Sequence, residues 1–368
     1  MKLLPTSHQS MPTRRRALRR TTTVRAAVAA VLAVTVVPLT AVPASAHERW
    51  FTDAAHGTDW SFAVRPLAVA ALVGAVAVSL LWRAAAARVG TPEIPALGWL
   101  GRLVPYVPRL LGIHLGVSLL ALASRGAFLS PSLPLADVPA GGFFVLLEAA
   151  VGVWLITGVR LREAALVVVG LGPALLLGAG PVAMLENAAL VGVAGFLVLV
   201  PPSDAPLGAV DASPVRLARA LLLLRLGAAV SLVGLAFSEK FTNPDMARAM
   251  LVDYPQLNIF ATLGIPVSTD AFIVLAGGVE VLFGLLILSG AAPQVVVPVA
   301  FVPFNLTLLL FGSTELIGHL PVYGVLLALL VYGSSAATAG PVRAFDVRPG
   351  RSLGDERPTR EAGRVNVV

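Results

Sequence analysis

Long apolar stretches recur along the chain from residue 66 to residue 333 and constrain its fold more than any other feature. Each is close to the roughly 20 residues that a helix needs to cross about 30 Å of hydrocarbon. Helices are the expected form because each satisfies its own backbone hydrogen bonds in lipid. We therefore predict an all-α, polytopic membrane protein. The nine predicted spans are at about 66–82, 110–128, 141–159, 163–181, 185–200, 217–237, 271–289, 293–312 and 316–333.

The composition supports this class and argues against others. The chain is 57% hydrophobic and only 13% charged, whereas about a quarter of the residues in a soluble domain are charged. Seven of the 27 lysines and arginines precede residue 26, and the segment after residue 46 carries 20 basic and 20 acidic residues. The basic excess therefore belongs to the N-terminal segment, and we expect no nucleic-acid partner. The chain has no cysteine, which excludes internal disulfides and thiol chemistry of its own.

Residues 1–46 have the pattern of an export signal peptide. A basic region up to Arg25 precedes the apolar run Ala26–Leu39, and Ala44-Ser45-Ala46 fits the small-residue cleavage pattern. An uncleaved first transmembrane helix is the alternative. Either way, residue 47 is expected outside and the C-terminus in the cytoplasm, with the protein in the cytoplasmic membrane. This orientation gives the inner segments fourteen arginines, against five basic residues outside, in agreement with the positive-inside rule.

An internal repeat with an offset of 132 residues is visible in the sequence. Glu148, Gly152, Gly158 and Gly180 correspond to Glu280, Gly284, Gly290 and Gly312. Four helices per repeat is an even number, so both repeats should insert the same way up, related by an axis along the membrane normal. The predicted organisation is a signal peptide (1–46), an extracytoplasmic segment (47–65), an extra span with a cytoplasmic loop (66–109), a first repeat (110–200), a linker (201–216), a second repeat (217–333) and a disordered cytoplasmic tail (334–368).

The second repeat has a characteristic residue in each of its four spans. Its first span ends in Ser238-Glu239-Lys240-Phe241, followed by Asn243-Pro244, and its second span carries a central Glu280 with Gly284. Asn305 in the third span and Gly318-His319 in the fourth complete the pattern. With these residues the repeat resembles the DoxX family of small four-helix membrane proteins. The first repeat resembles a diverged copy, which has Arg125-Gly126 where the second has Glu239-Lys240.

The resemblance implies a membrane redox role. Relatives in the family include a small subunit of thiosulfate:quinone oxidoreductase, others are linked to oxidative-stress and thiol-redox assemblies, and many have no assigned activity. We therefore expect a subunit of a quinone-linked system, with a membrane or periplasmic oxidoreductase as its partner. A transporter of a small solute, gated by Glu148 and Glu280, is a second hypothesis. A non-catalytic assembly factor is a third.

Charged residues inside the spans are the first candidates for a site, because a charge at the bilayer centre costs about 3 kcal/mol or more. Arg225 and Glu280 lie at depths that differ by only about 5 Å, so their long side chains are expected to meet. The pair would serve a proton relay or a quinone head group, or simply fix helix packing. Glu148 would pair with Arg225 across the repeats or stay protonated.

Further polar residues are expected near the outer mouth. Glu239, Lys240, Glu315 and His319 would form a polar rim there, or merely a solvated cluster at the interface. Residues 243–254 are expected to form a short amphipathic helix that lies over the outer mouth or on the lipid surface, or that is a plain connector. Pro298 and Pro303, in the same span as the candidate Asn305, would free carbonyls for binding or only bend the helix.

Metal and haem sites are not expected from the spans. His114 lies near the inner end of its span and His319 near the outer end of its own, too far apart to share a haem. Cleavage after Ala46 would make His47 the N-terminus, and its amine and imidazole would then be copper ligands, with His56 nearby. A histidine that follows the cleavage site by accident is the commoner case.

Overall fold

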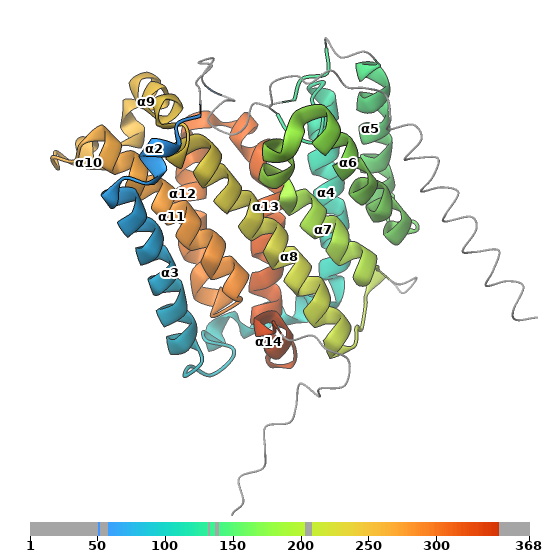
Figure 1. Cartoon of the computed structure of the whole chain (residues 1–368). Coiled ribbons are helices and arrows are strands. Elements are labelled where there is room, and N and C mark those ends of the chain that lie inside the picture. The colour runs from blue at the N-terminus through green and yellow to red at the C-terminus, as the bar shows by residue number, and fades with distance from the viewer. Residues whose placement is uncertain (1–50, 52–57, 132, 137–139, 203–207, 346–368) are drawn as a thin grey trace, which may run out of the picture.

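The protein is a helical bundle. The computed structural model describes residues 51, 58–131, 133–136, 140–202 and 208–345. Within these ranges the elements are helices, with a single isolated β-bridge between Ala127 and Pro134 (Figure 1). The predicted all-α class is confirmed. The proposed signal peptide and the candidate copper ligands His47 and His56 lie outside the described residues.

Seven helices of the described chain are long and apolar enough to cross a membrane. They are α3 (Pro66–Ala86), η2 with α4 (Pro95–Tyr106, Val107–Ser124), α6 (Leu161–Glu186), α8 with η4 (Pro214–Leu235, Ala236–Phe241), α11 (Thr269–Ser289), α12 (Pro293–Phe311) and α13 (Ser313–Gly333). Two apolar helices are shorter: α5 (Gly141–Thr157) and α7 (Ala188–Leu199). A bilayer is the environment that these helices suit. The short elements are α2 (Trp60–Ala63), α9 (Pro244–Asp253), η5 (Pro255–Leu257), α10 (Ile259–Thr262) and α14 (Ala336–Arg343).

Glycines allow several helix pairs to pack closely. A Cβ at Gly116 of α4 would lie 2.6 Å from the Gly152 carbonyl oxygen of α5. A Cβ at Gly227 of α8 would lie 2.6 Å from the Ala188 carbonyl oxygen of α7. Small residues at helix crossings are typical of membrane proteins, where van der Waals packing rather than water exclusion drives association. The result is a continuous row in which α3 packs on α11, α11 on α8, and α8 on α7.

The backbone changes direction at glycines that are 132 residues apart. Gly158 ends α5 with φ 78° and Gly290 ends α11 with φ 61°, a conformation that residues with a Cβ rarely adopt. Gly180 kinks α6 at φ 86°, and Gly312 separates α12 from α13 at φ 65°. The glycines aligned in the sequence therefore have similar backbone roles in both halves.

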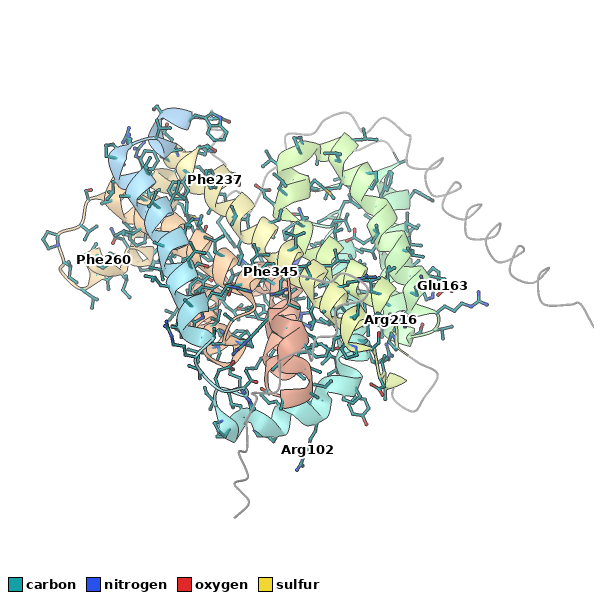
Figure 2. All side chains as sticks on the ribbon, turned by 60° about the horizontal axis from the view of Figure 1, so that its bottom comes forward. Arg102, Glu163, Arg216, Phe237, Phe260 and Phe345 are labelled. Atoms are coloured by element: carbon teal, nitrogen blue, oxygen red, sulfur yellow. The ribbon has the colours of Figure 1, made fainter. Side chains whose placement is uncertain are left out.

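The C-terminal segment differs from the expected disordered tail in its first part. Residues Ala336–Arg343 form α14, which packs against α8 and α13 and buries Val342 completely. Beyond α14, Phe345 lies at the centre of this end of the bundle (Figure 2). The helix forms because its apolar side chains find a surface between the ends of the long helices.

Replacing Gly116 by leucine is expected to destabilise the bundle by about 1–3 kcal/mol because of overpacking. The new side chain would meet the α5 backbone at Gly152. Thermal unfolding in mild detergent measures the loss. The matched control is Gly74→Leu in α3, where a Cβ meets nothing within 4 Å. Equal melting temperatures for the two variants would contradict the close α4–α5 contact.

Candidate functional site

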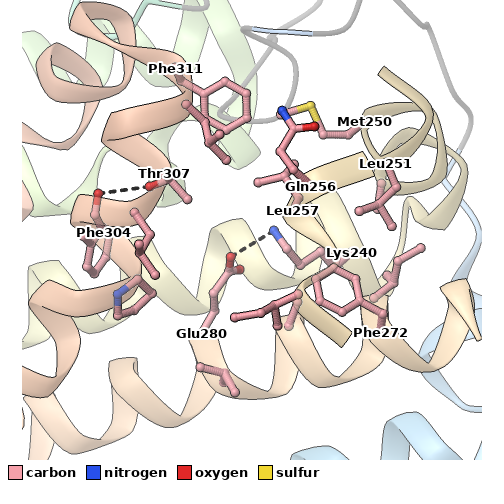
Figure 3. A pocket seen from close by; sticks show the side chains of 18 of the residues that line it. Lys240, Met250, Leu251, Gln256, Leu257, Phe272, Glu280, Phe304, Thr307 and Phe311 are labelled. Atoms are coloured by element: carbon pink, nitrogen blue, oxygen red, sulfur yellow. Dashed lines mark hydrogen bonds and ion pairs between the residues drawn. The ribbon is translucent and has the colours of Figure 1, made fainter. Parts of the chain in front are cut away.

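A cavity of about 840 Å³ lies in the second half of the chain, among α8, η4, α9, α10, α11, α12 and α13 (Figure 3). Most of its lining is apolar, with phenylalanines and leucines from several helices. The charged or titratable side chains in the lining are Lys240, Glu280, Glu315 and His319. An apolar cavity of this size with a few polar groups is typical of a small-molecule site.

A turn of π-helix directs Lys240 into the bundle. Helix α8 continues into η4, whose residues Ala236–Phe241 form this wider turn. π-turns are rare and frequently occur at functional sites. Within the turn Glu239 and Phe241 are completely buried and Lys240 is 7% exposed. The sequence predicted Glu239 and Lys240 in a polar rim or a solvated cluster, whereas the structure buries both side chains.

Lys240 forms an ion pair with the central glutamate of α11. Its Nζ lies 2.9 Å from Glu280 Oε1 and 3.7 Å from Glu239 Oε2, and Figure 3 shows the Lys240–Glu280 pair on the cavity wall. The Glu280 side chain is 31% exposed, although it lies near the middle of a long apolar helix. The pair is therefore accessible from the cavity.

Gly277 makes room for this pair on α11. A Cβ at this position would lie 2.9 Å from the Phe241 ring and 3.3 Å from Lys240 Cβ. Gly277 and Glu280 are three residues apart, so they share a helix face. Because Gly277 has no side chain, Phe241 and Lys240 can pack on the face of α11 that carries the Glu280 carboxylate.

A second polar pair lines the cavity on α13. His319 Nδ1 lies 3.3 Å from Glu315 Oε1 and 3.1 Å from the Glu315 carbonyl oxygen. Both residues are almost completely buried. The imidazole also meets the ring of Phe304 edge to face, with 5.0 Å between centroids. Lys240, Glu315 and His319 thus line one cavity as the sequence suggested, but as buried groups rather than a solvated rim.

The expected contact between Arg225 and Glu280 is wrong. Arg225 Nη2 donates a 2.5 Å hydrogen bond to the carbonyl oxygen of Ala344, after α14. Its guanidinium also lies 4.9 Å from the centroid of the Phe345 ring, which Arg83 contacts as well. A Cβ at Gly290 would meet Arg225 Nη1, so Arg225 lies level with the end of α11. Glu280 lies ten residues before Gly290, which is about 15 Å along the helix axis, so the two side chains are at different depths. Arg225 fastens the C-terminal segment to the bundle.

Glu148 also lies apart from the other expected site residues. Its carboxylate accepts hydrogen bonds from the backbone N–H of Leu129, at 3.1 and 3.4 Å. Helix α5 stands at the opposite side of the molecule from α11 (Figure 1). The structure therefore does not bring Glu148 together with Arg225 or Glu280, as the pairing and gate hypotheses required. The buried carboxylate instead fixes the loop after α4.

Asn305 and Pro298 lie outside the cavity lining, and of these three residues of α12 Pro303 alone contributes to it. Asn305 is exposed and its Nδ2 donates to the Phe301 carbonyl oxygen of its own helix, at 2.7 Å. Pro303 lines the cavity, and Pro298 lies one and a half turns earlier in α12. The Tyr323 hydroxyl donates to the Phe304 carbonyl oxygen at 3.1 Å.

The cover of the cavity comes from the segment after Asn243. The predicted short helix is present as α9, which begins at Pro244 and buries Met246, Ala247 and Met250. Ala247 and Met250 line the cavity, as do Leu257 of η5 and Phe260 of α10. Sequence reasoning found α9 but missed η5, α10 and the enclosed volume. The recurrence of large apolar residues in 246–263, among them Met246, Met250, Leu257 and Phe260, was the available signal.

The histidines are the residues on which the expectations about haem and metal ligands depend. His114 Nε2 forms a hydrogen bond with the Leu320 carbonyl oxygen, so it joins α4 to α13. Among the residues that the structure describes, no group of three or more His, Cys, Asp or Glu side chains is arranged to hold a metal ion.

Comparison with known proteins gives no relative. No family model, curated protein or solved structure matches the chain. The site is therefore interpreted from its own geometry.

Replacing Lys240 by methionine is expected to destabilise the protein. Lys240 is buried, with Glu239 completely buried at 3.7 Å, whereas the Glu280 side chain is 31% exposed. The loss should therefore exceed the roughly 1 kcal/mol of an exposed pair and stay below the roughly 3–5 kcal/mol of a fully buried one. Thermal unfolding in detergent measures the effect, and adding Glu280→Gln should restore part of it. The control is Arg248→Met on α9, whose pairs with Asp245 and Asp270 are exposed and worth under about 1 kcal/mol. Similar losses in the two variants would show that Lys240 is not held by a buried pair.

Proposed function

We propose that the protein is a DoxX-like subunit of a quinone-linked redox system in the cytoplasmic membrane, and that its cavity binds a quinone-class ligand. The observation that carries the proposal is the Lys240–Glu280 pair on the wall of a mostly apolar cavity, in which the Glu280 side chain is 31% exposed. A quinone combines an apolar ring with two carbonyl oxygens. The cavity offers apolar surface for the ring and charged groups for its oxygens.

The chemistry of the pair suits both oxidation states of such a ligand. The Lys240 ammonium can donate a charge-assisted hydrogen bond to a quinone carbonyl. The Glu280 carboxylate can accept one from a hydroquinone hydroxyl. Because the surrounding lining is apolar, these bonds would be stronger than in water. The proposal assigns binding to this chain, and electron transfer to an oxidoreductase partner in the membrane or periplasm.

The proposed organisation is two parallel four-helix repeats after an additional N-terminal span. It is supported by the matching backbone changes at Gly158 and Gly290, and at Gly180 and Gly312. In this scheme the copies have diverged in chemistry. Arg125 stands in the first copy near the position of Glu239-Lys240, and its guanidinium bonds the hydroxyls of Ser313 and Thr314 rather than Glu148. We therefore assign ligand binding to the second copy alone.

The first test is native mass spectrometry of the protein extracted in mild detergent, followed by titration with a short-chain quinone. Wild type is expected to retain or bind the quinone. Lys240→Met should raise the dissociation constant of the quinone about tenfold or more, because it removes the free energy of one charge-assisted hydrogen bond. Asn305→Leu is the control, since Asn305 is exposed and outside the cavity lining.

Three outcomes would contradict the proposal or redirect it. If no quinone is retained and none binds, the proposal is wrong. Equal affinity in wild type and Lys240→Met would place the quinone elsewhere. A change in solute flux through liposomes on Glu280→Gln, without quinone binding, would favour the transporter hypothesis instead.

A further inference from the structure

We infer that the cavity opens sideways between α11 and α12, and that its ligand is a long-tailed lipid whose tail lies in this opening. The inference rests on the proposed function and specifies its ligand class. The ligand would enter from the bilayer, and its tail would stay in contact with lipid.

The first observation is the exposure of the cavity lining. Leu275 and Val279 of α11 line the cavity, yet they are 41% and 46% exposed. Leu306 and Leu309 of α12 also line it and are 51% and 82% exposed. Lining side chains that are this exposed indicate that the cavity is not closed along α11 and α12. It is also open beside Ile259 of α10, which is 51% exposed. The four side chains on α11 and α12 are aliphatic, so the opening between these helices suits hydrocarbon rather than water.

The second observation is the loose packing of one half of α12. The buried residues of this helix all lie in its first half: Pro293, Gln294, Val296, Val297 and Ala300. Gln294 secures that half through hydrogen bonds with Ser334 and the Ile94 N–H. From Phe301 to Phe311 no side chain of α12 is buried. Aromatic contacts and the Tyr323 hydrogen bond hold this second half.

The third observation is the position of the charged pair relative to the opening. Glu280 lies eleven residues after the start of α11, which is about 16 Å along the helix axis. Leu275 and Val279 lie between that start and Glu280. A ligand with its head group at Lys240 and Glu280 would therefore extend its tail past these residues, towards the leaflet at the α9 end.

These observations together favour one kind of occupant. A freely water-soluble molecule would gain nothing from an aliphatic opening in the span region. A compact polar head joined to a flexible apolar tail fits both the charged pair and the opening. An isoprenoid quinone taken directly from the bilayer has this form, and burial of its tail would add affinity in proportion to the apolar area covered.

Photolabelling tests the position of the tail. Wild-type protein in lipid nanodiscs is irradiated with a quinone that carries a diazirine on a long alkyl tail, and the labelled peptides are sequenced. We expect label on residues 275–279 and 306–310, and competition by unlabelled long-tailed quinone. Label confined to α8, α9 or α13, with competition intact, would overturn the side opening while leaving quinone binding in place. Absence of any competed label would instead overturn the proposed function.

A matched pair of variants supplies a second measurement. Leu306→Trp places a large ring in the opening, whereas Val302→Trp alters an exposed position of the same helix outside the cavity lining. The affinity gained by lengthening the quinone tail should fall by about tenfold in Leu306→Trp and persist in Val302→Trp. Binding of a tail-less quinone should persist in both. If a longer tail raises the affinity equally in both variants, the inference is wrong. If wild type does not bind the tail-less quinone, the proposed function is wrong.

Discussion

The ammonium of Lys240 constrains the second half of the chain more than any other group, because a charge removed from water must be compensated locally. Glu280 supplies this compensation at 2.9 Å, from a helix that starts 29 residues further along the chain. Several local features serve the contact. The π-turn of η4 turns Lys240 inward, and Gly277 leaves space for it on α11. The cavity, with its charged wall and apolar remainder, follows from these requirements.

The two halves of the chain show how a shared frame can carry different chemistry. Glu148 and Glu280 occupy matching positions in the sequence, each four residues before a glycine at a close helix contact. Glu148 accepts hydrogen bonds from the backbone of Leu129 and is completely buried. Glu280 faces a cation and a cavity. The first half has the exposed Arg125 rather than a buried lysine, and its carboxylate stabilises a loop.

Much of the fold followed from the sequence, because span length, hydropathy and glycine positions are local properties. The helical class, the places of the long helices and the short helix after Asn243 were predictable in this way. The partners of the buried charges were not. Arg225 lies level with Gly290 at the end of α11 rather than with Glu280, because the offset between two packed helices is set by tertiary contacts and not by counting residues from each end. The π-turn of η4 follows Arg225 in the chain and turns Lys240 towards Glu280 instead. Likewise, the amphipathic pattern after residue 244 predicted α9 but not the volume that it encloses.

Exposure separates the buried charges that hold the fold from those that can meet a ligand. Arg225 is completely buried, and its contacts are the Ala344 carbonyl oxygen and the Phe345 ring. Such a group has no surface to offer, so its effect is to lock α14 against α8. Glu280 has a cation partner and still keeps 31% of its side chain exposed. Its Oε1 pairs with Lys240 and its Oε2 is buried, so the exposed part of this side chain, rather than the whole carboxylate, is what a molecule in the cavity can contact.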